Sequence, residues 1–197
     1  MKRLFLLRLL LCCLPGCSLL PSTMTSSSPS PPSALSTPRY PLLSPATYGR
    51  SYAAQHLLEG HAHGEDFTLQ IHVEIDPDYI LLLGFTPWQT RAFVLRYDGT
   101  TVDFENFTNR EMPFPPARIL SDLQQVLWPN LPNLNEWQVV DDPQTHERRV
   151  AFRDRLITRV RYQGVPPVQG VVELDNVALG YQLRIHIRED ESGQPQN

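Results

Sequence analysis

Residues 66–76 read Asp66-Phe67-Thr68-Leu69-Gln70-Ile71-His72-Val73-Glu74-Ile75-Asp76, with an apolar side chain at every second position. Successive side chains of a β-strand point to opposite faces, so this alternation predicts a strand with one buried and one solvated face. The stretches 155–162 and 181–188 alternate in a similar way. The pattern favours a fold of half-buried antiparallel strands.

Working outward from these three stretches, seven shorter ones have weaker strand patterns: 52–59, 79–83, 91–97, 101–107, 137–140, 148–152 and 170–174. Turn-forming residues separate neighbours, as in Asp76-Pro77-Asp78 and Tyr97-Asp98-Gly99. The short spacings suit antiparallel neighbours joined by tight turns. We therefore predict a mainly β fold, a curved antiparallel sheet or incomplete barrel of about ten strands.

One segment has the period of a helix instead. Pro115-Pro116 suits the first turn of a helix, and Trp128-Pro129 marks its end. The apolar side chains between these prolines fall on one face: Ile119, Leu120, Leu123, Val126 and Leu127. We expect this helix to lie as a lid across the concave face of the sheet and to bury its apolar stripe there.

The space beneath that helix is a candidate ligand cavity. Its walls are expected to come from the helix and from the strand over 91–97, with Phe93, Leu95, Ile119, Leu123 and Leu127 as lining residues. A solid core without room for a ligand is the alternative.

The N-terminus has the layout of a secretory signal. Met1-Lys2-Arg3 precedes an apolar run over residues 4–14, which is too short for a transmembrane helix. Leu14-Pro15-Gly16-Cys17 resembles the bacterial lipobox, which implies removal of residues 1–16 as a signal peptide and lipidation of Cys17. An ordinary signal with a chance cysteine is the alternative.

Lipidation of Cys17 implies a stable membrane anchor, because two or three acyl chains bury far more methylene groups than one chain does. By the lipoprotein sorting rule that accompanies the lipobox, Ser18 points to the outer membrane, with the domain in the periplasm. Residues 17–48 are rich in Ser and Pro and predict a flexible tether. We expect one β-rich domain over 49–190 and a disordered tail over 191–197.

The charge balance argues against nucleic-acid binding. Without residues 1–16 the chain has 14 basic and 21 acidic side chains, whereas phosphate binding normally needs a basic surface. Six arginines nevertheless lie between Arg148 and Arg161. They predict either a patch for phosphate or carboxylate groups or a solvated face of the sheet.

Catalytic and metal-binding motifs are weak. The sequence has no Gly-x-Ser-x-Gly motif and no phosphate-binding loop, and its cysteines are all among the first 17 residues. His61-Ala62-His63 beside Glu65 and Asp66 lies between two glycines, which favours a solvated turn over a metal site. We predict a protein that is not an enzyme and needs no cofactor or metal.

The segments 114–120 and 95–99, together with Asp122-Leu123-Gln124 and Trp128-Pro129, resemble an uncharacterised family of bacterial outer-membrane lipoproteins that is often encoded in aryl polyene gene clusters. The order of elements is also similar to that of the LolA and LolB lipoprotein carriers, which have an incomplete barrel and a helical lid over an apolar cavity. This resemblance implies binding or transfer of a lipid, a lipidated molecule or a polyene. It also implies that Phe85 and Trp88 form a loop that contacts the membrane or a partner.

A second class of function stays open from the sequence. The domain could have a filled core and act as a non-catalytic structural or assembly partner of an envelope protein complex. In that case its edge strands or arginine-rich strands would bind the other protein.

Overall fold

The computed structural model describes residues 37–108, 112, 114–163 and 170–189. Ten strands lie in these segments: β1 (Tyr52–Ala62), β2 (Glu65–Asp76), β3 (Tyr79–Phe85), β4 (Arg91–Tyr97), β5 (Val102–Asn106), β6 (Trp137–Asp142), β7 (Glu147–Phe152), β8 (Arg155–Gln163), β9 (Gly170–Asn176) and β10 (Tyr181–Glu189). The predicted mainly β fold is confirmed. The signal peptide, Cys17, Ser18 and the tail over 191–197 lie outside the described residues.

The strands form one antiparallel sheet in the order β5-β4-β3-β2-β1-β10-β9-β8-β7-β6. Each half of the chain therefore makes a five-stranded meander of hairpins, and the first strand pairs with the last. The β1–β10 register runs from Ala54 opposite Glu189 to His61 opposite Gln182. Among the described residues, β5 and β6 are the two edges of this open sheet.

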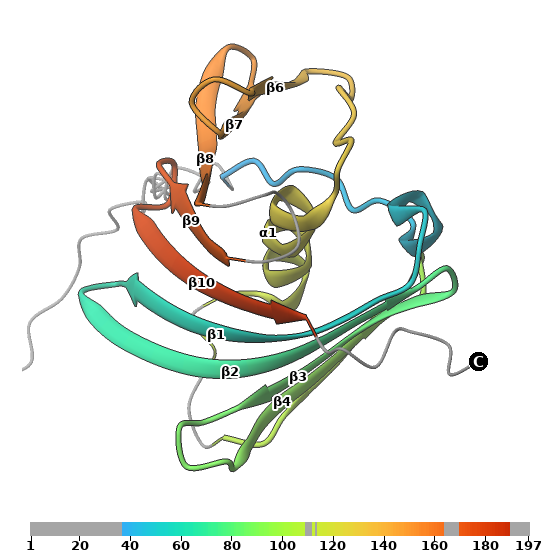
Figure 1. Ribbon diagram of the computed structural model, residues 1–197, viewed down its shortest axis with the longest axis vertical. Coiled ribbons are helices and arrows are strands. Elements are labelled where there is room, and N and C mark those ends of the chain that lie inside the picture. Colours follow the sequence, from blue (N-terminus) through green and yellow to red (C-terminus); the bar gives the residue numbers. More distant parts are fainter. Residues whose placement is uncertain (1–36, 109–111, 113, 164–169, 190–197) are drawn as a thin grey trace, which may run out of the picture. The chain divides into compact units, whose positions relative to one another are not determined.

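The alternation seen in residues 66–76 separates the two faces of the sheet. Val73 and Ile75 are fully buried, while their neighbours Glu74 and Asp76 are only half-buried. Figure 1 shows that the sheet is curved, with the helix over 116–127 on its concave side. The buried apolar side chains of the sheet and of this helix belong to one core cluster, so the apolar face of the sheet is the concave one. Alternation with one apolar face thus produces a core on the concave side.

The helix α1 (Pro116–Leu127) lies against the concave face, as Figure 1 shows. It begins after Pro115, whose backbone is extended, and its last turn ends at Trp128. Because α1 lies between β5 and β6 in the chain, and these are the opposite edges of the sheet, it has to cross the sheet. The prediction of a curved sheet with one lid helix is confirmed.

The C-terminal end of α1 is held by the buried side chain of Arg148 from β7. Its Nη1 donates to the carbonyl oxygens of Gln125 (2.8 Å) and Trp128 (2.7 Å), and its Nε donates to Asp141 Oδ1 at 2.6 Å. A helix ends with unpaired carbonyl groups and a partial negative charge, so a guanidinium is well suited to this place. Arg148 therefore belongs to the core and lies outside the arginine patch considered from the sequence.

The other side of α1 is covered by residues 37–48, here called the strap, which include a short 3-10 helix, η1 (Pro45–Tyr48). The side chain of Gln124 accepts from the backbone N–H of Leu43 (2.9 Å) and donates to its carbonyl (2.8 Å). Tyr40 is fully buried and its ring meets Trp137 edge-on at 5.5 Å. The sequence places these residues in the tether, but buried tyrosines and paired backbone groups make residues 37–48 part of the packed domain.

Replacement of Arg148 should destabilise the domain strongly. Arg148→Met leaves several carbonyl groups at the end of α1 without a donor, and we expect a loss of about 3 kcal/mol in the free energy of unfolding. Arg149→Met is the matched control, because Arg149 is half exposed and pairs with Glu147 only at 3.6 Å. Its effect should stay within about 0.5 kcal/mol. Equal losses for the two variants in chemical denaturation would contradict this role of Arg148.

Candidate functional site

An apolar cavity of about 70 Å³ lies between α1 and the concave face of the sheet. Thirteen of its fifteen lining residues are apolar, and the other two are His56 and Asp122. The apolar lining comes from four neighbouring strands, from β10, from α1 and from the segment before α1: Leu58, Phe67, Leu69, Ile71, Val73, Leu82, Phe93, Met112, Phe114, Ile119, Leu123, Leu183 and Ile185. The arrangement is suited to an apolar group.

Two glycines give the floor of this cavity its shape. Gly60 lies opposite Phe67, and Gly84 lies opposite Phe93, in adjacent strands. A Cβ atom on Gly60 would be 2.1 Å from the Phe67 ring, and one on Gly84 would be 2.2 Å from the Phe93 ring. Both phenylalanine rings therefore lie over backbone that has no side chain, which leaves room above them.

The outer wall of the cavity is made of half-buried side chains. Ile119 and Leu123 come from α1, and Met112 and Phe114 from the segment before it. The Phe114 ring packs against that of Tyr181, with 4.3 Å between their centroids. Each of these four side chains lines the cavity and is also in partial contact with solvent.

The five residues expected to line a cavity are not all brought together. Phe93, Ile119 and Leu123 line the cavity described here. Leu95 and Leu127 are fully buried in the core and are not among its lining residues. The sequence does not single out Phe67, although it belongs to the alternating stretch. Gly60 and Gly84 lie just beyond the predicted strands 52–59 and 79–83, so their place inside β1 and β3 opposite phenylalanine rings appears only in the structure.

His56 of β1 is the first of the two polar groups in the cavity wall. Its Nε2 is 2.9 Å from the hydroxyl oxygen of Tyr52, which lies four residues earlier in β1 and therefore on the same face of the strand. Burial lowers the pKa of His56 to about 4, and repulsion from His72 acts in the same direction. The imidazole is therefore neutral at pH 7.

Asp122 of α1 is the second polar group, and it is only 5% exposed. Its Oδ2 accepts a short hydrogen bond from the Tyr181 hydroxyl, whose oxygen accepts in turn from Asn176 Nδ2 at 3.0 Å. Burial raises the pKa of Asp122 to about 7, against the opposing effects of the Tyr181 hydrogen bond and of Arg118. The carboxyl group is therefore poised between its neutral and ionised forms near pH 7.

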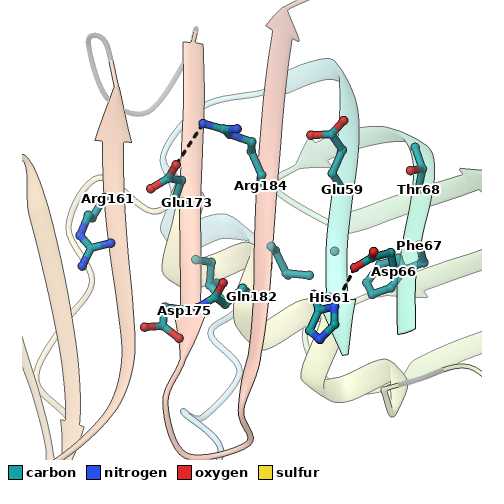
Figure 2. Close-up of a pocket in the computed structure, with 13 residues that line it drawn as sticks. Glu59, His61, Asp66, Phe67, Thr68, Arg161, Glu173, Asp175, Gln182 and Arg184 are labelled. Carbon is teal, nitrogen blue, oxygen red and sulfur yellow. Dashed lines mark hydrogen bonds and ion pairs between the residues drawn. The ribbon is translucent and has the colours of Figure 1, made fainter. Parts of the chain in front are cut away.

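A second hollow, of about 530 Å³, lies on the convex face over β8, β9, β10, β1 and β2. Figure 2 shows its charged side chains, with Arg184 Nη2 3.3 Å from Glu173 Oε1 and His61 Nδ1 2.7 Å from Asp66 Oδ1. The side chains of these pairs are between 34% and 90% exposed, and ion pairs in contact with solvent contribute about 0–1 kcal/mol each. The face is consistent with a solvated surface of mixed charge.

The arginines of the predicted patch are divided between two environments. Arg148 is buried, whereas Arg149, Arg159 and Arg161 lie 3.3–3.6 Å from the carboxylate oxygens of Glu147. Arg161 also lies opposite Glu173 in the sheet. Acidic neighbours thus offset the positive charge, which weakens the case for an anion-binding patch.

The predicted membrane or partner loop joins β3 to β4. Phe85 is half-buried at the end of β3, and Trp88 is 83% exposed in the turn that follows. The other two tryptophans, Trp128 and Trp137, are buried. Trp88 is therefore free to contact another surface.

Within the described segments, no three His, Cys, Asp or Glu side chains are placed to hold a metal ion. His63 and Gly64 both have positive φ and form the β1–β2 turn, while Gly60 lies inside β1. Over the same part of the chain, no helix has the length and hydrophobicity needed to cross a membrane.

Comparison with known protein families gives a match that covers the sheet and the helix. The model of the family described as Protein of unknown function (DUF3261) matches residues 53–189. This range runs from the second residue of β1 to the last residue of β10, so it includes the whole sheet and α1. No curated protein matches the chain.

The two polar groups of the cavity should give opposite pH dependence of stability. The raised pKa of Asp122 makes the free energy of unfolding fall as pH rises from about 4 to 7, because the folded state keeps a proton that the unfolded state has lost. The lowered pKa of His56 makes it rise between about pH 4 and 6.5, because the unfolded state then binds more protons. In the wild type these two contributions largely cancel.

Asp122→Asn removes one of the two contributions. Relative to the wild type, the free energy of unfolding of this variant should increase by roughly 3 kcal/mol between pH 4 and 6.5. Denaturation at a series of pH values measures it, with the exposed Asp103→Asn of β5 as the control that should follow the wild type. Parallel curves for Asp122→Asn and wild type would show that Asp122 ionises normally.

Proposed function

The chain belongs to the DUF3261 family of proteins of unknown function, and we propose that this member is an outer-membrane lipoprotein whose periplasmic domain binds or transfers a lipid, a lipidated molecule or a polyene-type apolar chain. The observation that carries the proposal is the cavity between α1 and the concave face, with its thirteen apolar lining residues. Buried apolar surface with a few polar groups is the usual setting for a small-molecule site.

The volume of the cavity limits the size of the ligand that it can hold. Pockets for drug-sized ligands usually have about 300–1,000 Å³, and this one has about 70 Å³. An acyl or polyene chain therefore enters only when outer-wall side chains turn away. Met112, Ile119 and Leu123 are half-buried, and a methionine side chain adapts readily to different shapes.

The contacts between the strap and α1 restrict how the cavity can open. It holds α1 through Gln124 and through Ser121, whose hydroxyl donates to the Tyr40 carbonyl at 3.0 Å. Arg148 holds the other end of the helix. With α1 fixed along its length, ligand entry through the side chains of the outer wall is favoured over movement of the whole lid.

The architecture also supports a likeness to the LolA and LolB carriers, in which a helical lid covers the concave side of an incomplete barrel. The polyene class of ligand follows only from the resemblance to lipoproteins of aryl polyene clusters. Trp88 and Phe85 are proposed to contact the membrane or the partner that delivers or receives the ligand. The large exposed fraction of Trp88 supports this role.

A second candidate function is a structural or assembly partner of an envelope complex. Two observations favour it, namely the small cavity and the two open edges of the sheet, β5 and β6, within the described residues. Exposed edge strands are ready to pair with another chain. Ligand binding separates this function from the first.

A cavity-filling substitution tests the proposed binding. Leu123→Phe enlarges a side chain of the cavity wall and should weaken binding of a fluorescent fatty acid or polyene by about tenfold, because overpacking costs about 1–3 kcal/mol. Leu57→Phe on the outer face of β1 is the matched control and should bind as the wild type does. Thermal melting checks that both variants fold. Equal affinities for the folded Leu123→Phe variant and the wild type would exclude this cavity.

The proposed anchor is tested at Cys17. Cys17→Ser should abolish metabolic labelling with a radioactive fatty acid and release the protein from outer-membrane fractions, because the thioether forms only on a thiol. Ser18→Asp should retain labelling and shift the protein toward the inner membrane. Unchanged labelling of Cys17→Ser would contradict lipidation at this residue.

A further inference from the structure

The two oxygen atoms of Asp122 have different surroundings. Oδ2 accepts from the Tyr181 hydroxyl, and that hydroxyl is fixed by Asn176. Oδ1 is buried and has no hydrogen-bond partner among the described residues. Since Asp122 is part of the cavity wall, the unpartnered oxygen belongs to a polar group that borders an otherwise apolar space.

A buried oxygen without a partner is costly, and the cost is greater if the carboxyl group is ionised. The other polar residue of the cavity wall, His56, already has Tyr52 as a partner for its Nε2. Two further buried side-chain oxygens, on Thr158 and on Gln125, also have no partner among the described residues, but neither residue lines the cavity. Among the described side chains that line the cavity, Asp122 Oδ1 is thus the buried polar atom that has an unused capacity for hydrogen bonds.

We propose that Asp122 Oδ1 binds a hydroxyl group of the apolar ligand, so that the ligand is a neutral hydroxylated lipid. This inference rests on the proposed function, because it needs the cavity to accept an apolar chain. The hydrocarbon chain of the ligand would lie against the rings of Phe67 and Phe93, with the ligand's hydroxyl group at Asp122.

The chemistry of the carboxyl group explains why a hydroxyl fits. Tyr181 donates to Oδ2, so the proton of the neutral acid resides on Oδ1 and points to a ligand acceptor. In the ionised form Oδ1 accepts and needs a ligand donor. A hydroxyl group serves in both cases, whereas an ether serves only the neutral acid and a fatty-acid carboxylate is repelled by the ionised form.

The charged and titratable groups around Asp122 keep their states over the range needed for a test. Arg118, one turn earlier on α1, is the basic side chain whose charge acts on Asp122. Tyr181 of β10 has a raised pKa, caused by burial and by Asp122, and stays neutral. His56 of β1 has a pKa of about 4 and is neutral at pH 5 and above. Asp122 itself, with a pKa of about 7, changes state between pH 5 and pH 8.5.

Binding of 1-octanol and of its methyl ether at these two pH values tests the inference. The full chain carrying Cys17→Ser avoids the acyl anchor, and titration calorimetry gives the two dissociation constants. At pH 8.5 we expect octanol to bind at least about tenfold more tightly than the ether, because only octanol donates to the carboxylate. At pH 5 the ratio should fall to about one, since the neutral acid donates to either oxygen.

Two variants identify Asp122 as the origin of this preference. Asp122→Leu should bind both probes with a ratio of about one at both pH values. Asp122→Asn keeps the size of the side chain and should give a ratio that does not change with pH. Thermal melting checks folding, and the Asn variant gives the result if the Leu variant does not fold.

The possible outcomes distinguish a failure of the hydroxyl site from a failure of the proposed function on which it rests. A ratio of about one for the wild type at both pH values, with octanol still bound, overturns the hydroxyl site and leaves the cavity as a site for apolar chains. A pH-dependent ratio that persists in Asp122→Asn also overturns it. Absence of binding for both probes contradicts the proposed function itself.

Discussion

The pairing of the first strand with the last is the interaction on which the rest of the structure depends. Each half of the chain forms a meander of five strands, and the ladder from Ala54 and Glu189 to His61 and Gln182 joins the halves into one sheet. This pairing makes β5 and β6 the outer edges. The connection between them, which contains α1, therefore has to span the sheet, and the apolar concave side is where an amphipathic helix is stabilised.

The position of α1 in turn sets the chemistry beneath it. Toward β1–β4 the helix faces phenylalanine rings laid over two glycines, and toward β9 and β10 it faces the Asn176–Tyr181 pair. Asp122 lies where these two environments meet. The strap and Arg148 hold the helix in this place, so the cavity has an apolar part and a polar part with a fixed boundary.

The sequence predicts the elements far better than it predicts the site. Alternation in residues 66–76 and the prolines around α1 are local signals, and both elements lie where these signals indicate. The surroundings of a single side chain depend on the whole sheet. The helical pattern therefore predicts Leu127 in the cavity wall, whereas the structure places it in the core. The sequence likewise groups Arg148 with neighbouring arginines of the sheet, whereas its side chain is buried and holds the end of α1. The sequence contains one indication that Asp122 is unusual, because this carboxyl residue lies three positions after Ile119 on the apolar face of the helix.

The central claim is that the concave face of this sheet holds an apolar ligand. Native mass spectrometry of the full chain, released gently from membranes, tests this claim most directly, because the ligand need not be known in advance. We expect a one-to-one complex with a lipid-sized molecule that dissociates on unfolding. A mass equal to that of the lipidated chain alone, from preparations that retain their fold, would contradict it.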